Sequence, residues 1–171
     1  MTTSNSIIGS CGEHYVAAYL AGHGLIVALP RAGVPGSDLF VGSVSGGNPL
    51  RVQVKTGTRS LGNTKWGKIY QWPTSCSIID SHHVRLWYAY VWLNGWPAKN
   101  GQPEVFFIPS LDVAACMKKE RDENKDRPTW RPFFWMDYDD AQQHRDNAGV
   151  KSLIEATTAN DPAVLATAAG T

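Results

Sequence analysis

One long apolar segment constrains the fold more than any other feature of the chain. Residues 84–95, VRLWYAYVWLNG, are apolar at most positions, so a strand formed by them has no face suited to water. Such a strand belongs in the middle of a sheet that is covered on both sides. We therefore expect an α/β or α+β domain with a central mixed β-sheet flanked by helices.

Shorter patterns predict the elements around this strand. Apolar residues at three- and four-residue steps indicate a helix over 6–21 that ends at Gly22 or Gly24. Apolar runs bounded by Gly and Pro predict strands, and the SGGNP segment makes a hairpin of two of them. The remaining expected elements are strands at 24–30, 37–44, 50–56, 104–110 and 131–136, and helices at 111–125 and 137–149. Residues 57–83 mix Gly, Pro, Ser and Trp and predict no single element.

Length and composition bound the class of protein. With 171 residues and 43% hydrophobic content, the chain is expected to form one domain over 1–155, followed by a flexible Ala/Thr-rich tail over 156–171. Three cysteines at wide spacings predict reduced thiols rather than a zinc site. The start lacks a signal-peptide pattern and no long apolar run occurs, so we expect a cytoplasmic protein without a membrane segment.

The charge is uneven along the chain although the net charge is only +1. Residues 1–79 hold six Lys or Arg against two acids, and five of those six bases fall between positions 51 and 68. A concentrated positive segment favours an anionic partner, of which phosphate is the commonest. A solvated basic loop would have the same composition.

The stretch LRVQVKT (50–56) has a polar face that is unusual for a short strand. Its period of two places Arg51, Gln53 and Lys55 on one side. Asp38 begins the neighbouring hairpin strand, and Glu13 lies on the preceding helix, so both can approach that face. Each residue also has an ordinary interpretation: Asp38 as a turn residue, Gln53 and Lys55 as solvent-facing hairpin residues, and Glu13 as an exposed helix acid.

The order of these residues resembles a known family. GE (12–13) on the first helix, PGSD (35–38) and QVK (53–55) are similar to the motifs of the PD-(D/E)XK nuclease superfamily, in the branch that carries QxK. The resemblance implies a restriction-endonuclease-like core. It also implies a metal-dependent endonuclease that hydrolyses phosphodiester bonds in nucleic acid, with DNA as the expected substrate.

The resemblance assigns a role to each matching residue. Asp38, Gln53 and Glu13 would hold Mg²⁺ or Mn²⁺, because these ions bind hard oxygen donors. Lys55 would orient the attacking water and stabilise the charge that develops on the phosphate. Gln53 stands where the family more often has an acid, so the ion would lack one negative ligand unless Glu13 supplies it.

The resemblance and the composition together suggest how nucleic acid is held. Related small nucleases work as dimers or tetramers, so a homo-oligomer is expected. Trp66, Trp72 and Tyr70 form an aromatic group suited to stacking on unpaired bases. The residues expected to contact the phosphate backbone are Arg51, Arg59, Lys65 and Lys68.

Other functions stay open on the sequence alone. The neutral Gln53 is compatible with a nucleic-acid-binding module that no longer cuts. The Trp-rich segment is compatible with a protein-interaction domain, such as an immunity or toxin-neutralising partner. The adjacent His82 and His83 point to opposite sides of an extended chain, which favours a loop over a metal site.

Overall fold

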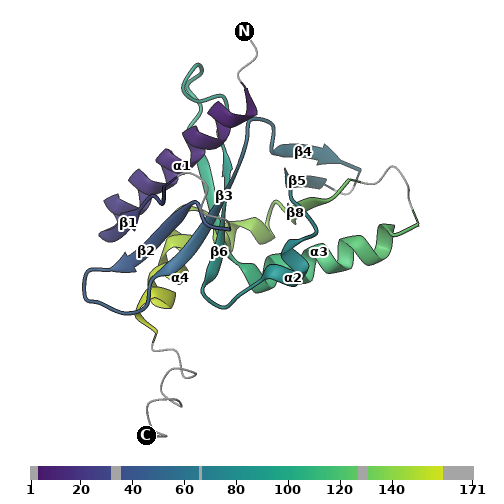
Figure 1. Ribbon diagram of the computed structural model, residues 1–171. Coiled ribbons are helices and arrows are strands. Elements are labelled where there is room, and N and C mark those ends of the chain that lie inside the picture. Colours follow the sequence, from purple (N-terminus) through teal and green to yellow (C-terminus); the bar gives the residue numbers. More distant parts are fainter. Residues whose placement is uncertain (1–3, 32–35, 66, 127–130, 160–171) are drawn as a thin grey trace, which may run out of the picture.

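The structure is a computed structural model that describes residues 4–31, 36–65, 67–126 and 131–159. Within these ranges the chain forms two sheets and a set of helices packed on them (Figure 1). In chain order the elements are α1 (Asn5–Gly22), β1 (Leu25–Ala28), β2 (Leu39–Ser43), β3 (Leu50–Gly57), β4 (Leu61–Thr64), β5 (Gly67–Pro73), α2 (Ile78–Ser81), β6 (Leu86–Trp92), β7 (Glu104–Pro109), α3 (Ser110–Asn124), β8 (Phe133–Asp137), the 3-10 helix η1 (Asp140–His144) and α4 (Asp146–Thr158).

The larger sheet confirms the predicted central role of the apolar segment. Its strand order is β1-β2-β3-β6-β7, so β6 is an interior strand. β3 and β6 run parallel, while the other neighbouring strands are antiparallel, which makes the sheet mixed. The predicted hairpin is β2–β3, in which Leu39 pairs with Val52.

One face of this sheet is covered by α1 and α4. Ser4 caps α1 by accepting a hydrogen bond from the N–H of Ile7, and Gly24, with φ of 81°, follows the helix end. Val16 and Leu20 of α1 pack with Val52 of β3 in a continuous apolar core. Because this side of α1 packs against β3, the packing also sets the directions in which the remaining side chains of α1 point.

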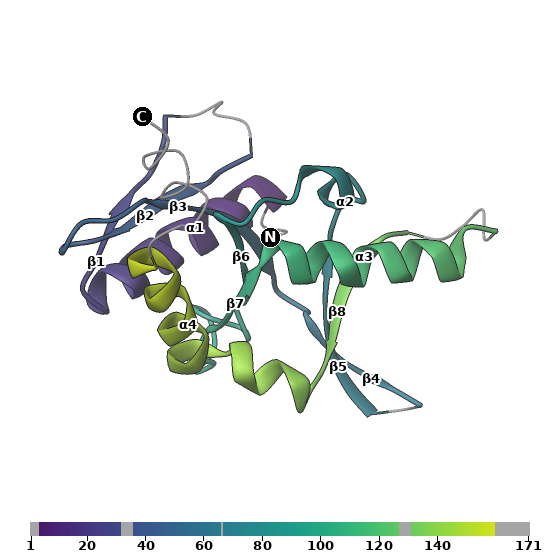
Figure 2. The same cartoon turned by 90° about the horizontal axis from the view of Figure 1, so that it is seen from below.

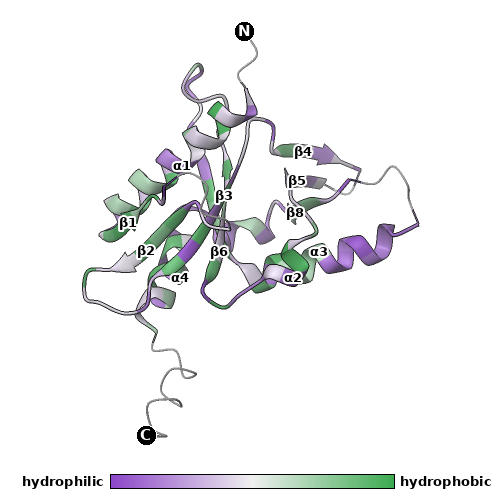
Figure 3. Cartoon of the chain, viewed as in Figure 1, coloured by the Kyte–Doolittle hydropathy of each residue, from purple (hydrophilic) through white to green (hydrophobic). Residues whose placement is uncertain are grey.

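The other face carries a second layer that the sequence did not reveal. Residues 57–83 form β4, β5 and α2, and β8 joins them as the edge strand of a three-stranded sheet with order β4-β5-β8. This sheet, α2 and α3 pack on the outer face of β6 and β7, opposite α1 and α4 (Figure 2). The C-terminal half of α3 is hydrophilic, as expected of its charged sequence (Figure 3).

The helix expected over 137–149 is wrong in its limits. The segment is η1 followed by α4, which begins at Asp146 with φ of 46°. Gly149 lies inside α4 instead of ending it, and a Cβ there would overlap the carbonyl of His144, which is a packing reason for glycine at this position. The expected tail begins within α4, and residues 160–171 lie outside the described part of the chain.

Two further expectations concern the class of protein. Cys11, Cys76 and Cys116 are free thiols, as predicted. In the described ranges, no helix has the length and apolarity needed to cross a membrane.

Candidate functional site

Asp38 is fixed at the start of β2 by the backbone of β3. Its N–H donates to the carbonyl of Val52 at 3.0 Å, and the N–H of Val54 donates to its Oδ2 at 2.7 Å. Because Leu39 pairs with Val52, one further step in the register places Asp38 opposite Gln53. The carboxylate therefore lies alongside the segment of β3 that carries Gln53 and Lys55.

Gln53 and Lys55 occupy the face of β3 that looks away from the α1 core. Val52 and Val54 are buried in that core, whereas Gln53 and Lys55 are partly exposed. In the sheet register Gln53 is next to Tyr88 and Lys55 is next to Tyr90 of β6. The alternation predicted for this strand is confirmed.

Glu13 lies on α1 and is influenced by the charge of Asp38. Burial raises its pKa, and the negative charge of Asp38 raises it further, with a smaller opposing effect from His14. The electrostatic effect of Asp38 requires the two carboxylates to be near each other. We call Glu13, Asp38, Gln53 and Lys55 the hairpin cluster.

Gly12 allows this approach, although the sequence analysis assigned it no role. It is buried, and a Cβ at this position would overlap the Thr56 side chain of β3. α1 can therefore lie close to β3 only with glycine here, and the next residue is Glu13. A glycine within a helical pattern was the available signal, because such a position usually has a packing reason.

Tyr88 is a second neighbour of Asp38 that the sequence did not indicate. It is buried on β6, and its pKa is raised to about 12, first by burial and then by the charge of Asp38. The charge of Asp38 therefore acts on both the carboxyl group of Glu13 and the phenol of Tyr88. Tyr88 lies beside Gln53 because β3 and β6 pair in parallel with these two residues in register.

The hairpin cluster holds two acids and one base, and none of the three forms an ion pair with a described residue. The ion pairs found between described residues join Arg121 to Asp122 and Arg145 to Glu104 and Asp146, so none involves the hairpin cluster. No three residues among His, Cys, Asp and Glu gather into a potential metal cage in the described ranges. A cation bound here would have two carboxylates and one amide as its protein donors.

The predicted backbone-binding residues spread from this cluster toward the β4–β5 hairpin. Arg51 shares the polar face of β3 and is partly buried, while Arg59, Lys65 and Lys68 are exposed beyond the end of that strand. The Nζ of Lys68 lies 5.6 Å from the ring centroid of Tyr138. Arg51 lies on β3 of the larger sheet and Lys68 on β5 of the smaller one, so the predicted bases span both sheets, whose relative places are seen in Figure 1.

The aromatic residues proposed for stacking have a different place. Trp72 has 0% and Tyr70 1% of its surface exposed, so the expectation that they stack on bases is wrong. Their rings lie in the core between the two sheets, with centroids 5.9 Å apart, and the indole of Trp72 donates to the carbonyl of Val91. Trp66 lies outside the described residues.

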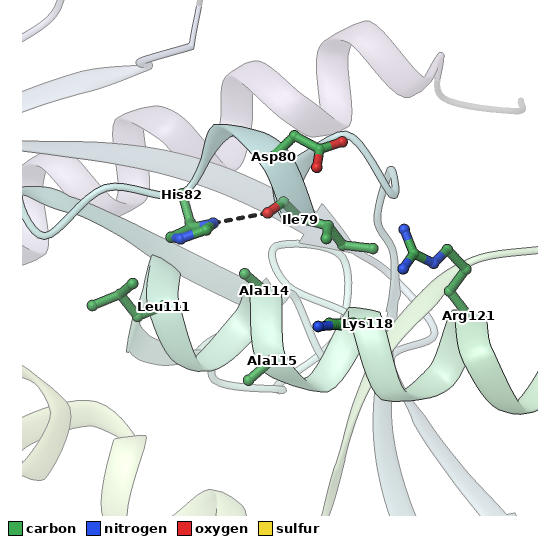
Figure 4. A pocket seen from close by; sticks show the side chains of 8 residues that line it. All are labelled: Ile79, Asp80, His82, Leu111, Ala114, Ala115, Lys118 and Arg121. Carbon is green, nitrogen blue, oxygen red and sulfur yellow. Dashed lines mark hydrogen bonds between the residues drawn. The ribbon is translucent and has the colours of Figure 1, made fainter.

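The histidine pair is part of a connecting segment, as expected. His82 Nδ1 bonds to the carbonyl of Ile79, and His83 Nδ1 accepts from the N–H of Arg85. His82 lines a hollow of about 460 Å³ between α2 and α3, together with Asp80, Lys118 and Arg121 (Figure 4). One acid beside two bases does not suit a divalent cation, and this hollow includes no residue of the hairpin cluster.

Comparison with known proteins places the fold. No protein-family model and no curated protein matches the sequence. The structure is similar to that of a bacterial homing endonuclease, with a TM-score of 0.57 and 13% sequence identity over 97% of this chain and 99% of that chain. The chain therefore has an α+β fold with a central mixed sheet flanked by helices, shared with a nuclease.

Proposed function

We propose that the protein is a metal-dependent endonuclease that hydrolyses phosphodiester bonds in DNA, with the hairpin cluster as its reacting centre. The observation that carries the proposal is the placement of Asp38 against the segment of β3 that bears Gln53 and Lys55, with the charge of Asp38 raising the pKa of Glu13 on α1. Groups whose pKa is shifted by burial and by a like charge are enriched at functional sites. The shared fold with a homing endonuclease supports the same activity.

The donors of the hairpin cluster fit Mg²⁺ or Mn²⁺. Asp38 and Glu13 offer carboxylate oxygens and Gln53 offers an amide oxygen, all of which are hard ligands. Mg²⁺ usually takes one or two carboxylates and fills its other positions with water and substrate phosphate. The order of GE, PGSD and QVK supports assignment to the QxK branch of the PD-(D/E)XK nucleases, although Pro35 lies outside the described residues.

Each side chain then has a defined task. The bound cation would polarise the phosphate and lower the pKa of a coordinated water. The bond from the N–H of Val54 to Oδ2 orients the Asp38 carboxylate, so that Oδ1 can serve as a ligand. Lys55 directs its ammonium at the attacking water and at the charge that develops on the phosphate oxygens.

Binding of the substrate would involve the four predicted bases and a second copy of the chain. Arg51, Arg59, Lys65 and Lys68 would contact successive backbone phosphates, which makes the affinity depend steeply on salt. A homodimer or tetramer would supply two reacting centres for the two strands of a duplex. Light scattering of the purified protein, with and without DNA, measures this state directly.

Cleavage of supercoiled plasmid and of branched DNA tests the proposal. We expect nicking in Mg²⁺ or Mn²⁺ and none with EDTA. Lys55→Met should lower the rate by about 10²–10³-fold, the usual cost of losing one group that stabilises transition-state charge. Lys151→Met, on the exposed side of α4, is the matched control and should cut like the wild type.

Two outcomes would contradict the proposal in different ways. Salt-dependent DNA binding without cleavage under any of these conditions would indicate a binding module that does not cut. Failure to bind DNA or RNA even at low salt would favour a protein-interaction domain, because phosphate-driven association is strongest there.

A further inference from the structure

One row of polar side chains crosses three neighbouring strands of the larger sheet. Asp38 lies opposite Gln53 in the β2–β3 hairpin, and Gln53 pairs in register with Tyr88 of β6. The strands β2, β3 and β6 are consecutive in the sheet (Figure 1). Paired residues of neighbouring strands project to the same face, so these three side chains are neighbours. The row therefore extends beyond the hairpin cluster to Tyr88.

The ring of Tyr88 is held firmly, whereas its hydroxyl is not used by the fold. Only 4% of the residue is exposed, and its ring stacks on that of Tyr90, with centroids 5.7 Å apart and planes inclined by 18°. No described residue forms a hydrogen bond with the hydroxyl. In the described ranges, the fully buried side-chain polar atoms without a partner belong to Thr56, Ser60 and Arg85. The Tyr88 oxygen is unbonded and is not one of these sealed atoms, so it keeps an exposed surface.

Tyr90 shows the opposite use of a hydroxyl on the same face of β6. It is 0% exposed, and its hydroxyl lies 3.3 Å from Oγ1 of Thr74 in the core between the two sheets. A buried tyrosine usually finds a partner for its hydroxyl within the protein. Tyr88 is nearly as buried and has no such partner among the described residues, so its partner comes from outside the chain, as water or as substrate.

The surroundings of the Tyr88 hydroxyl decide which substrate group suits it. Burial and the charge of Asp38 raise the pKa of Tyr88 to about 12, so the phenol is a hydrogen-bond donor at neutral pH. Gln53 adds amide N–H donors beside it, and Lys55 adds an ammonium two residues further along β3, about 7 Å away. A negatively charged oxygen is the acceptor that suits such a set of donors. A cation bound at Asp38 would offset the charge of that carboxylate.

We propose that Tyr88 is a further catalytic residue, whose hydroxyl donates a hydrogen bond to a non-bridging oxygen of the phosphate that is cleaved. Tyr88 forms no covalent bond and transfers no proton, so it acts only on the charge that develops on that oxygen. The proposal rests on the proposed nuclease function for the reaction. It rests on the sheet register, the stacked ring and the open hydroxyl for the position of the donor.

Tyr88→Phe tests the proposal because it removes the hydroxyl and keeps the stacked ring. We expect kcat/KM for plasmid nicking in Mg²⁺ to fall by about 10–100-fold, the value of one hydrogen bond to a charged group. Tyr90→Phe makes the same change on the same face of β6 and is the matched control. It should cut within about threefold of the wild type, because its hydroxyl bonds to Thr74 in the core. Equal losses in both variants, or none in Tyr88→Phe, would overturn the proposal.

Urea denaturation should place the two variants in the opposite order. The Tyr88 hydroxyl bonds to no described residue, so Tyr88→Phe should unfold at the same or a higher urea concentration than the wild type. Tyr90→Phe should unfold at a lower concentration, because it loses the bond to Thr74. Lower stability of Tyr88→Phe together with unchanged cleavage would make Tyr88 a structural residue.

The pH dependence of cleavage distinguishes a donor from a base. With a pKa of about 12, the Tyr88 phenol stays protonated at neutral pH. The ratio of the wild-type rate to the Tyr88→Phe rate should therefore be constant between about pH 6 and pH 9. A ratio that rises by about tenfold per pH unit would mean that the ionised phenol is the active form, and would overturn the role as donor.

A binding measurement distinguishes failure of this proposal from failure of the nuclease function. A short fluorescein-labelled DNA duplex is titrated with the wild type and both variants in Ca²⁺, which also binds hard oxygen ligands. If the wild type never cuts, weaker binding by Tyr88→Phe alone, by about three- to tenfold, would support its phosphate contact and refute the endonuclease. A wild type that cuts, with a Tyr88→Phe that binds and cuts like it, would refute the role of Tyr88 alone. A wild type that binds no DNA would refute both.

Discussion

Two polar clusters in this protein differ in whether their acidic side chains are paired with a base. In the arginine cluster, formed by Tyr70, Glu104, Arg145 and Asp146, each acid has partners. Arg145 lies 3.2 Å from Glu104 and 3.1 Å from Asp146, and the hydroxyl of Tyr70 donates to Glu104 at 2.7 Å. In the hairpin cluster Asp38 accepts one backbone bond, and its charge raises the pKa of a second acid, Glu13.

The difference indicates what each cluster is for. The arginine cluster joins β5, β7 and the start of α4, and its neutralised charges serve the fold. In the hairpin cluster the bond from the N–H of Val54 to Asp38 serves the hairpin, but the nearness of Asp38 raises the pKa of Glu13, a cost that natural proteins tolerate mainly at functional sites. Replacing single residues should therefore change activity in one cluster and stability in the other.

The largest expected effect is the loss of cleavage in Asp38→Asn. The amide oxygen can still accept the N–H of Val54, so the substitution removes the charge and keeps the bond. A metal ligand contributes several kcal/mol to the transition state, so we expect a fall of about 10³-fold or more. Plasmid nicking in Mg²⁺ measures the rate, and circular dichroism checks the fold.

Asp146→Asn makes the same chemical change in the arginine cluster. It should cleave within about threefold of the wild type, because among the described residues Asp146 bonds to Arg145 and to the backbone of Val105, neither of which belongs to the hairpin cluster. Comparable losses of cleavage in both variants would remove the distinction between the clusters.

Arg145→Met should have the largest effect on stability. It leaves Glu104 with only its bond from Tyr70, in a position where its side chain is 13% exposed. Breaking a fully buried pair costs about 3–5 kcal/mol, and partial exposure of Arg145, at 29%, reduces our expectation to about 2 kcal/mol. Urea denaturation measures this loss, and cleavage below the unfolding transition should be unchanged. A loss of under about 0.5 kcal/mol would show that the pair is not structural.

The sequence predicted those features of the hairpin cluster that depend on local pattern. The alternation in 50–56 correctly separated Gln53 and Lys55 from the core, and the helix over 6–21 correctly placed Glu13 on α1. Contacts between distant segments were not visible. The bond from Val54 to Asp38 depends on the hairpin register, and the proximity of Tyr88 depends on a parallel pairing across a long connection.

The arginine cluster was missed for the same reason. Tyr70 and Glu104 are 34 positions apart, and β5 pairs not only with its neighbour β4 but also with β8, which is remote in sequence. Trp72 was misassigned to a surface because basic residues surround it in the chain, whereas tertiary packing buries it. Local composition predicts exposure poorly for a strand that is buried by pairing and packing with segments far away in the sequence.

Gly12→Ala tests how the hairpin cluster is assembled. A methyl group would overlap Thr56, so α1 must shift away from β3. We expect a loss of about 1–3 kcal/mol from overpacking and a lower cleavage rate, because Glu13 moves with the helix. Urea denaturation and plasmid nicking measure the two effects.

Gly9→Ala is the matched control on the same helix. No atom lies within 4 Å of a Cβ built at Gly9, so alanine should fit without displacement. It should raise stability by about 0.5–1 kcal/mol through helix propensity and leave cleavage unchanged. If Gly12→Ala behaves like Gly9→Ala, close packing of α1 on β3 does not set the position of Glu13.

The smallest effect, Glu13→Gln, probes the charge imbalance directly. The pKa of Glu13 is raised in the folded protein, so folding disfavours its ionised form. This unfavourable contribution is absent below the ordinary value of 4.5, where the acid is protonated in both states, and it grows as pH rises above 4.5 and is complete above the raised pKa. In EDTA at neutral pH, Glu13→Gln should be more stable than the wild type by less than about 1 kcal/mol, and this gain should vanish in acid.

Added Mg²⁺ should reverse that order if the hairpin cluster binds the ion. The cation stabilises the wild type in proportion to its affinity, and the variant lacks one carboxylate ligand, so the wild type should gain more. Urea denaturation with EDTA and with Mg²⁺ measures both differences, and Glu155→Gln, an exposed acid on α4, should show neither. A variant that is less stable in EDTA, with no response to Mg²⁺, would mean that Glu13 supports the fold as the arginine cluster does. Asp38 would then be the single acid of the two clusters without a neutralising partner among the described residues. The two clusters would differ only in how many of their acids are paired.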